Sequence, residues 1–408
     1  MGNLIQDVKY GARMLRRNPS FTAVAVLTLA LGISSTTAIF SLINATLLAP
    51  LPYPNSGRIV SLMLHYAHGD QTSLAIPEFM AMREANQVLQ DFCLYDFAGP
   101  GINLTGGDRP QEIKGIHVSA GYFKLFSAPI AIGHPFSAAE DIPHGPHVAV
   151  ISYGLWKSRF GGDPGILGRT IDVNGNSTVV TGVMGRTFHA DPPSDIWLPL
   201  EADPNSVDEA HYLLGAAMLK PGITLAQANA RLDQVAAAFR RKFPQFGSLM
   251  GQQTSFRVQP LSELEVSGIK SALLVMLGAV SFVLLIACAN VANLLLARAT
   301  IRKREIAIRA AIGAGRGRIV RQLLTESILL SLSGGVFGLV FGYAGVRELL
   351  AVSPADLPRT GTHGSAVALD WRVLVFAIAV SVLTGILFGL IPALNAARAD
   401  LNASLKES

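Results

Sequence analysis

Four long stretches of this sequence contain no Asp, Glu, Lys or Arg, and they constrain its fold more than any other feature. They cover residues 18–57, 271–297, 327–346 and 373–397. A helix that crosses a lipid bilayer needs about 20 mostly apolar residues. One such stretch is compatible with a buried helix of a soluble protein, but four of them predict four transmembrane helices. The charged share of only 15% agrees, because soluble domains average about 25%.

The first stretch, preceded by four basic residues, also resembles a signal peptide. A signal peptide, however, has an apolar region of about 7–15 residues. Here the apolar run extends from Phe21 to Leu48, which predicts a retained helix. A helix over 20–48 would be roughly 43 Å long, against a hydrocarbon core of about 30 Å. We therefore expect it to tilt or to extend outward as a stalk.

The basic residues orient the chain. The net charge is +3 in residues 1–19, +6 in 298–326 and −4 in 50–270. Because Lys and Arg are enriched in cytoplasmic loops, both termini and the 298–326 loop are predicted to be cytoplasmic. The basic residues that give the overall charge of +5 lie beside the spans, so this charge does not indicate nucleic-acid binding.

The predicted fold class is an α-helical membrane protein with four transmembrane helices and an inserted α/β (α+β) extracytoplasmic domain. A segment before the first span, with Leu4, Val8, Ala12 and Leu15 at helical spacing, predicts an interfacial helix. The predicted segments are the interfacial helix 1–19, transmembrane helix 1 with stalk 20–49, extracytoplasmic domain 50–266, transmembrane helix 2 267–298, cytoplasmic loop 299–319, transmembrane helix 3 320–352, outer loop 353–370, transmembrane helix 4 371–394 and cytoplasmic tail 395–408.

Local patterns predict elements of the inserted domain. The spacing of apolar residues predicts helices over Pro77–Phe92 and Leu225–Lys242, the second capped by Thr224. Strands at Thr170–Val173 and Ser177–Val183 flank Asn-Gly, which favours the positive φ of a hairpin turn.

Catalytic and metal motifs are weak or missing. The pairs His65/His68 and His144/His147 have no accompanying Cys or carboxylate cluster, so solvated loop histidines are the favoured interpretation. The sequence contains no P-loop, G-x-S-x-G or H-E-x-x-H motif. We therefore predict that the chain is not an enzyme and has no cofactor or metal of its own. Cys93 and Cys288 are expected on different segments, without a disulfide.

The basic loop contains a short amphipathic segment that ends at glycine. Ile306 and Gly313 lie on one side of a predicted helix, and Glu305 pairs with Arg309 at i,i+4. The segment either only fixes topology or docks a cytoplasmic partner, and the residues alone leave both interpretations open. The residues that would contact the partner are Arg304, Glu305, Ile306, Arg309 and Gly313.

Small and polar residues in the spans predict helix association. Glycines recur every four residues, and small residues let helices approach closely; the members are Gly334, Gly338, Gly342, Gly385 and Gly389, with Ser381 one turn before Gly385. Asn290 and Asn293 are polar within lipid and are predicted to face other helices, as are Asn44, Thr36 and Thr37. A channel lining is the alternative, but no charged residue lies deep in a span, so an ion pathway has little support.

Five motifs are spread along the whole chain: RMLRRNPSFTA at 13–23, YGLW at 153–156, FGGDP at 160–164, CANVANLLLAR at 288–298 and REIAIR at 304–309. They resemble the corresponding motifs of MacB/FtsX-type ABC transporter permeases, especially those of one half of the duplicated permeases. The resemblance implies that 50–266 is a MacB-like periplasmic core domain and that 299–319 is a coupling loop.

The resemblance further implies a location in the cell inner membrane and a set of partners. A separate MacB-type ATPase would bind ATP and engage the coupling loop, since only about 20 residues precede the first span. A second permease copy, as a homodimer or paired half, would complete the membrane part. A periplasmic adaptor and an outer-membrane duct would complete the export path, and the substrate would be handled on the periplasmic side.

Two other functions compete with export. The first is an FtsX-like transmembrane regulator of a periplasmic or cell-wall enzyme, and the second is an anchored extracytoplasmic enzyme. The inserted domain, of about 210 residues, is larger than a minimal regulator needs, which favours export, and no catalytic constellation supports the enzyme.

Overall fold

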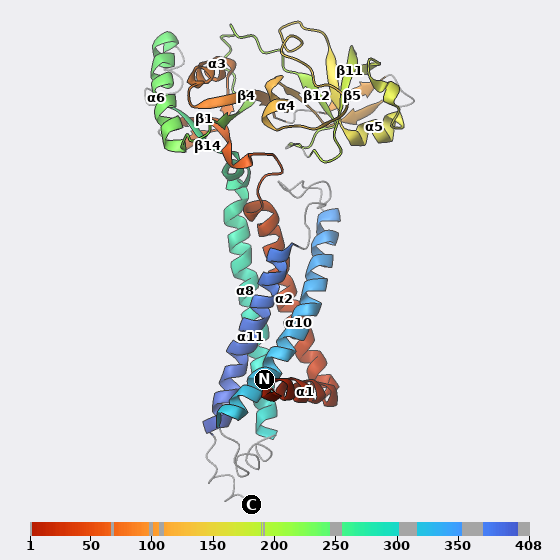
Figure 1. Ribbon diagram of the computed structural model, residues 1–408, viewed down its shortest axis with the longest axis vertical. Helices are drawn as coiled ribbons and strands as arrows, with labels where there is room; N and C mark the ends of the chain where they lie inside the picture. The colour runs from red at the N-terminus through yellow and green to blue at the C-terminus, as the bar shows by residue number, and fades with distance from the viewer. Residues whose placement is uncertain are drawn as a thin grey trace, which may run out of the picture. The chain divides into compact units, whose positions relative to one another are not determined.

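The computed structural model divides the chain into two compact units (Figure 1). The helical unit comprises 1–49 and 268–408, and the inserted domain comprises 50–267. The structure describes residues 2–66, 69–97, 101–105, 110–188, 190, 192–244, 255–301, 316–352 and 370–398.

The helical unit is built from long apolar helices. Among the residues that the structure describes, four helices are long and apolar enough to cross a membrane, over Pro19–Leu48, Gly268–Arg298, Val320–Glu348 and Trp371–Leu390. Together with the mixed inserted domain, they confirm the predicted fold class. The helices are α1 (Gly2–Arg17), α2 (Pro19–Ile43) with a π-helical turn (Asn44–Leu48), α8 (Leu261–Ile301), α10 (Arg316–Val352) and α11 (Trp371–Arg398).

The described strands of the inserted domain form one mixed sheet. Its order is β14-β1-β13-β4-β7-β12-β9-β11-β10-β5-β6, with β2, β3 and β8 paired at its sides. Most neighbours are antiparallel, but β7/β12 and β9/β11 are parallel. The strands are β1 (Ile59–Tyr66), β2 (Gly69–Gln71), β3 (Ser73–Leu74), β4 (Leu89–Asp96), β5 (Ile102–Thr105), β6 (Gln111–Ile113), β7 (Gly115–Val118), β8 (Ile130–Gly133), β9 (Val148–Ile151), β10 (Thr170–Val173), β11 (Asn176–Met184), β12 (Ile196–Pro199), β13 (Leu213–Leu219) and β14 (Ser255–Pro260).

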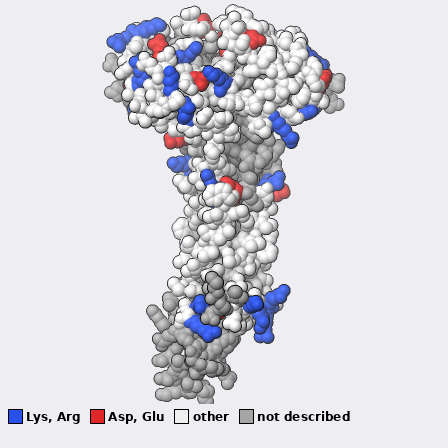
Figure 2. Space-filling model, in the orientation of Figure 1, with Lys and Arg blue, Asp and Glu red and all other residues white. Residues whose placement is uncertain are grey.

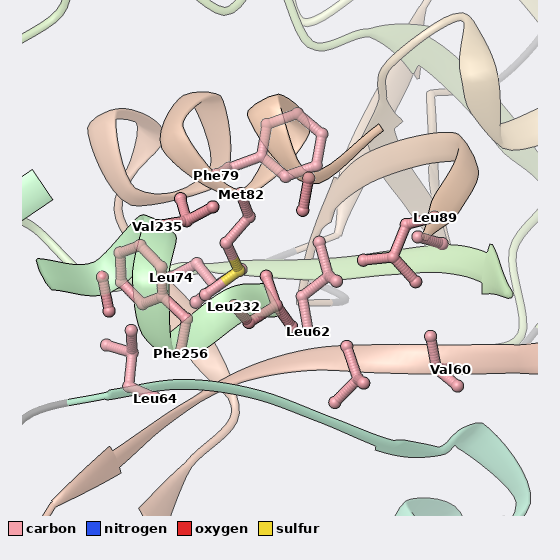
Figure 3. Close-up of a cluster of buried hydrophobic side chains, with 14 of the residues drawn as sticks. Val60, Leu62, Leu64, Leu74, Phe79, Met82, Leu89, Leu232, Val235 and Phe256 are labelled. Carbon is pink, nitrogen blue, oxygen red and sulfur yellow. The ribbon is translucent and has the colours of Figure 1, made fainter. Parts of the chain in front are cut away.

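Four helices pack against the sheet, and apolar side chains are buried between the helices and the strands. The helices are α3 (Ile76–Met82), α4 (Gly121–Leu125), α5 (Tyr153–Phe160) and α6 (Leu225–Lys242). Side chains from α3 and α6 meet alternate residues of β1, such as Leu62 and Leu64, in one apolar cluster (Figure 3). Ile59, on the other face of β1, belongs to an aromatic-rich cluster with Tyr122 of α4. This alternation follows from the two-residue period of a strand.

Two of the local predictions are confirmed. The helix α6 begins after Thr224, whose hydroxyl accepts a hydrogen bond from the Gln227 N–H while Gln227 accepts one from the Thr224 N–H. This capping box satisfies N–H groups that have no partner inside the helix. The hairpin β10/β11 turns at Asn174 and Gly175, with φ of 52° and 85°.

The predicted helix Pro77–Phe92 is wrong in its second half. The helix α3 ends at Met82, a 3-10 turn covers Arg83–Ala85, and Leu89 begins β4. Residues 89–96 pair instead with β13 in the sheet, from Leu89↔Leu219 to Asp96↔Leu213. Pairing with a central strand outweighed the helical spacing of Phe79, Met82, Leu89 and Phe92.

Candidate functional site

The residues predicted to contact a partner lie outside the part of the chain that the structure describes. These are Arg304, Glu305, Ile306, Arg309 and Gly313. The segment is bounded by the end of α8 at Ile301 and the start of α10 at Arg316. We call the end of the helical unit marked by Arg298 and Arg316 the basic end.

At the basic end, α1 is tied to α10. Arg321 donates a 2.8 Å hydrogen bond from Nε to Asp7 Oδ2, and Asp7 is only 8% exposed. One turn later, Gly11 packs against Leu329 and Glu326 of α10. The face of α1 that meets the protein therefore contains positions 7 and 11, whereas Val8 of the predicted apolar stripe is 38% exposed. The exposed apolar side is suited to the membrane interface.

The contact between α2 and α10 runs along three glycines of α10. A Cβ at Gly334 would lie 2.8 Å from Leu29 Cβ, and one at Gly338 would lie 3.0 Å from Ile33 Cβ. At Gly342 it would lie 2.9 Å from the backbone oxygen of Ser34. These helices approach so closely that the contact leaves no space for side chains at the glycines.

The contact between α10 and α11 pairs serine with glycine. Gly335 faces Ser381, Gly385 faces Ser331, and Gly389 faces Ser327. One of these serines lies on α11 and the other two lie on α10, and each contact places a small hydroxyl over a glycine of the other helix. Ser327 and Ser331 were not predicted, although they precede Gly335 by eight and four residues, a spacing that places all three on one side of the helix.

Asn290 and Asn293, which were predicted to face other helices, lie away from the other described helices of this chain. Both are exposed on α8. The buried side of α8 instead carries Cys288 and Val291, which pack with α2. Polarity alone predicted contact, but the position of the amides around the helix places them on the opposite side. By contrast, Asn44, Thr36 and Thr37 are buried.

At the end opposite the basic end, polar contacts join α2 to α11. Asn44 is 5% exposed and donates from Nδ2 to Asp370 Oδ2 at 3.3 Å. Arg372 donates from Nη1 to the carbonyl oxygen of Leu48 at 3.0 Å. The donor Asn44 and the acceptor Leu48 both belong to the π-helical turn that follows α2. Such turns are common at functional sites.

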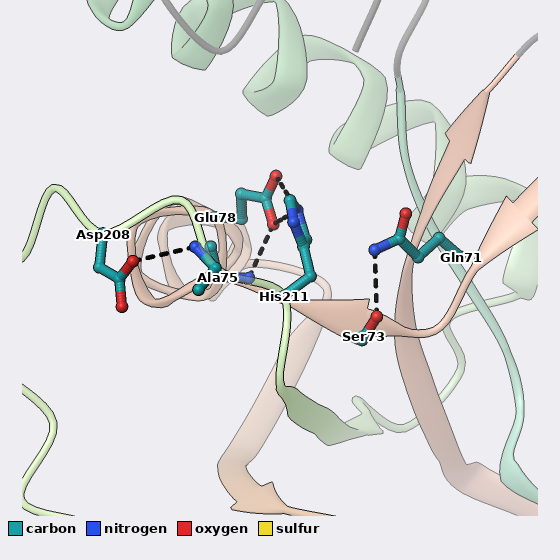
Figure 4. A network of polar contacts seen from close by, with 7 residues as sticks. Gln71, Ser73, Ala75, Glu78, Asp208 and His211 are labelled. Carbon is teal, nitrogen blue, oxygen red and sulfur yellow. Dashed lines mark hydrogen bonds and ion pairs between the residues drawn. The ribbon is translucent and has the colours of Figure 1, made fainter. Parts of the chain in front are cut away.

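The inserted domain contains a buried ion pair that the sequence did not reveal (Figure 4). Glu78 is fully buried; it accepts a 2.9 Å hydrogen bond from the Ala75 N–H and lies 3.1 Å from His211 Nε2. The hydrogen bond to Glu78 raises the pKa of His211, with Asp208 and Glu209 contributing. This pair attaches the loop before β13 to the start of α3.

The histidines and cysteines give no catalytic centre among the described residues. His65 pairs with Asp70 on the β1/β2 hairpin, and His68 lies outside the described residues. Within the described ranges, no group of three or more His, Cys, Asp or Glu could hold a metal ion. Cys93 and Cys288 are both free and buried, in different units.

Two family models match the chain in succession. The MacB-like periplasmic core domain matches residues 22–235, and the FtsX-like permease C-terminal model matches residues 277–401.

Similar proteins include permeases and larger fused proteins. The uncharacterized ABC transporter permease YknZ of Bacillus subtilis is 26% identical over 288 residues, which cover 69% of this chain and 67% of YknZ. The pyoverdine export ATP-binding/permease protein PvdT of Pseudomonas syringae is 30% identical over 69% of this chain and 41% of PvdT. The macrolide export ATP-binding/permease protein MacB of Marinobacter nauticus is 26% identical over 98% of this chain and 60% of MacB. The chain thus spans 41% to 67% of the length of these relatives.

Two solved structures are similar to part of the chain. The extracellular domain of YknZ gives a TM-score of 0.36 at 14% identity and covers 49% of this chain and 99% of that one. The periplasmic region of MacB from Actinobacillus actinomycetemcomitans also gives 0.36 at 14% identity, with coverage of 57% and 97%.

Proposed function

Because the chain belongs to the MacB/FtsX-type family of ABC transporter permeases, we propose that it is the membrane subunit of an exporter driven by a separate ATPase. Four apolar helices and a periplasmic-type domain fit a protein of the inner membrane. In the proposal, both termini and segment 302–315 face the cytoplasm, the ATPase binds at Arg304 to Gly313, and the inserted domain handles the substrate in the periplasm. We propose further that the first span extends outward as a stalk, and that a periplasmic adaptor and an outer-membrane duct complete the export path.

The observation that carries this proposal is the way α10 is held. It starts directly after segment 302–315 and is fixed to α1 by Asp7, to α2 by its glycines and to α11 by the Ser/Gly contacts. Close-packed helices transmit displacement because they cannot be compressed. A push at Arg316 would therefore move α10 together with its neighbours rather than bend it.

The distribution of charge also favours a lever over a pore. On the face seen in Figure 2, the charges of the helical unit lie towards its two ends. The sequence has no charged residue in 327–346 or 373–397, and ion pathways usually need one.

The test is co-purification of the full chain with its ATPase, followed by single substitutions in the proposed docking segment. Glu305→Ala and Arg309→Ala should each weaken the complex and lower stimulated ATP hydrolysis, whereas Arg13→Ala, at an exposed basic residue of α1, should not. Unchanged binding in both docking variants would remove the coupling-segment assignment.

The FtsX-like regulator is the second candidate, because the FtsX-like model over 277–401 is compatible with it as well as with export. A neighbouring gene for a cell-wall hydrolase would support it. A neighbouring ATPase gene together with an adaptor gene would support export.

A further inference from the structure

The helix α1 has three different sides, of which two are exposed. Asp7 and Gly11 lie on the side that packs against α10. With about 3.6 residues per turn, Val8 and Ala12 share the next side around the helix, which is apolar and exposed. The side beyond them is basic and also exposed, and it carries Lys9, Arg13 and Arg16, with Arg17 at its border.

Hydrogen bonds hold α1 in one orientation. At one end, Asp7 is tied to α10. At the other end, Asn18 donates from Nδ2 to the Met14 carbonyl oxygen at 3.2 Å, and the Thr22 hydroxyl donates to the Leu15 carbonyl oxygen at 2.8 Å. These bonds fix the corner between α1 and α2, so that α1 lies across the direction of the long helices (Figure 1). The apolar and basic sides are therefore presented together, in fixed directions.

The position of α1 in the chain places these sides at the boundary between hydrocarbon and headgroups. The helix ends at Arg17, and the first candidate span begins two residues later at Pro19. An exposed apolar side at this depth is suited to the acyl chains nearest the headgroups. The long side chains of Lys and Arg on the neighbouring side reach outward from there to the level of the phosphates.

The basic side has no carboxylate of its own. Asp7 is the only acidic residue in 1–19, and it is buried against Arg321. Among the described residues, none forms an ion pair with Lys9, Arg13 or Arg16. Like charges four residues apart repel each other on a helix, so an anion from outside the chain would stabilise this side. At this depth the available anion is a phosphate, and a guanidinium matches two phosphate oxygens at once.

We propose that the basic side of α1 binds the headgroups of anionic phospholipids. Because Asp7 ties α1 to α10, bound headgroups hold the start of α10 at the membrane surface together with α1. This inference rests on the proposed function only for placing α1 on the cytoplasmic side, where anionic lipids attract basic segments beside a span. It requires no ATPase.

Native mass spectrometry of the full chain tests lipid binding directly, in mixed micelles with equal amounts of phosphatidylglycerol and phosphatidylcholine. The unmodified chain should retain phosphatidylglycerol several-fold more than phosphatidylcholine. Each basic residue near an anionic surface strengthens binding about fivefold. The triple variant Lys9→Gln, Arg13→Gln and Arg16→Gln should therefore lose about tenfold or more of this retention. Equal retention by the triple variant and the unmodified chain would overturn the proposal.

A matched control removes the same number of basic charges from exposed positions of the inserted domain. It combines Arg241→Gln, Lys242→Gln and Arg257→Gln and should retain phosphatidylglycerol as the unmodified chain does. An equal loss in this control would mean that the lipid responds only to net charge, which would overturn the assignment to α1. The variant Arg13→Lys with Arg16→Lys keeps both charges and should retain most of the lipid. A loss as complete as with glutamine would show that charge does not hold the lipid.

The lipid assay contains no ATPase, so its outcome is separate from that of the proposed function. Arg13→Ala should leave ATPase binding intact under both proposals, because this side of α1 contacts lipid. If the triple glutamine variant releases the ATPase but keeps the lipid, α1 docks the ATPase and the lipid proposal is rejected. If Glu305→Ala and Arg309→Ala leave ATPase binding unchanged while the triple variant loses lipid, the coupling assignment falls and this site stands.

Discussion

The guanidinium of Arg321 lies 2.8 Å from the carboxylate of Asp7, so an ion pair joins residues 314 positions apart in the sequence. It holds α1 against α10 five residues after α10 begins. A displacement of the start of α10 would therefore reach α1 as well as the spans.

We predict that Asp7→Asn releases α1. The neutral amide keeps the shape but loses the charge that Arg321 faces, and the pair is partly exposed, so the cost should be about 1 kcal/mol. Trypsin should then cleave after Arg13, Arg16 or Arg17 faster than in the unmodified protein. The control Gln6→Asn, at an exposed position of α1, should leave the rate unchanged. Equal rates for Asp7→Asn and the control would show that the pair does not hold α1.

Two glycines one turn apart in α10 should respond oppositely to the same substitution. Gly342→Ala places a methyl group 2.9 Å from the Ser34 backbone oxygen, which cannot move aside cheaply. We expect a loss of about 1–3 kcal/mol. At Gly345 nothing lies within 4 Å of the added carbon, so Gly345→Ala should be neutral or stabilising by up to about 1 kcal/mol. Thermal unfolding in detergent measures both, and a lower melting temperature for Gly345→Ala would contradict the packing described.

The Ser/Gly contact between α10 and α11 should tolerate exchange of its members. Gly335→Ser alone brings two hydroxymethyl groups into one space and should destabilise the helical unit by about 1–3 kcal/mol. The double variant Gly335→Ser with Ser381→Gly moves the side chain to the other helix and should recover most of that loss. A double-mutant cycle followed by thermal unfolding reports the coupling, and additive losses would exclude the direct contact.

His211 should make the stability of the full chain depend on pH. Because Glu78 raises the pKa of His211, the pair contributes fully below the ordinary histidine value of 6.5. That contribution is lost as the pH rises through the elevated pKa. His211→Ala should cost about 1–3 kcal/mol at pH 6 and less at pH 9.

Denaturant unfolding at several pH values checks this prediction, with His134→Ala as control because the His134 side chain is exposed and its ring contacts the carbonyl oxygen of Pro135. An equal cost of His211→Ala at pH 6 and pH 9 would show that the charge on His211 does not contribute. Tyr66, whose pKa is raised to about 12 by burial and Glu78, remains neutral throughout this range.

Local signals in the sequence predicted the parts of the fold that local physics decides. The Asn-Gly turn and the Thr224 cap each satisfy their own backbone groups within a few residues, so both could be identified without the rest of the chain. The run from Leu89 to Asp96 could not, because its neighbour β13 lies more than 110 residues later. The helical spacing of its apolar residues was real but was outweighed by pairing in the sheet.

The candidate site shows the same limit. The glycine spacing in α10 indicated a close contact between helices. The identity of the helix that packs against each glycine follows only from the folded structure. Asp7–Arg321 and Glu78–His211 join distant segments, and nothing near either residue distinguishes it from a solvated charge. For Asn290 and Asn293, the sequence predicted a need for contact but not the side of α8 on which they lie.

The chain enters and leaves the inserted domain on two adjacent strands, since β1 begins beside the end of β14, with Val60 opposite Pro260. An equal force on both connections would move the domain as one body without straining the pairing of β1 with β14. Unequal pulling would peel its hydrogen bonds apart one after another from that end, which is the geometry of least mechanical resistance. The same adjacency means that a short turn could replace the whole domain, so that swapping it between relatives would need only two junctions, near residues 58 and 261.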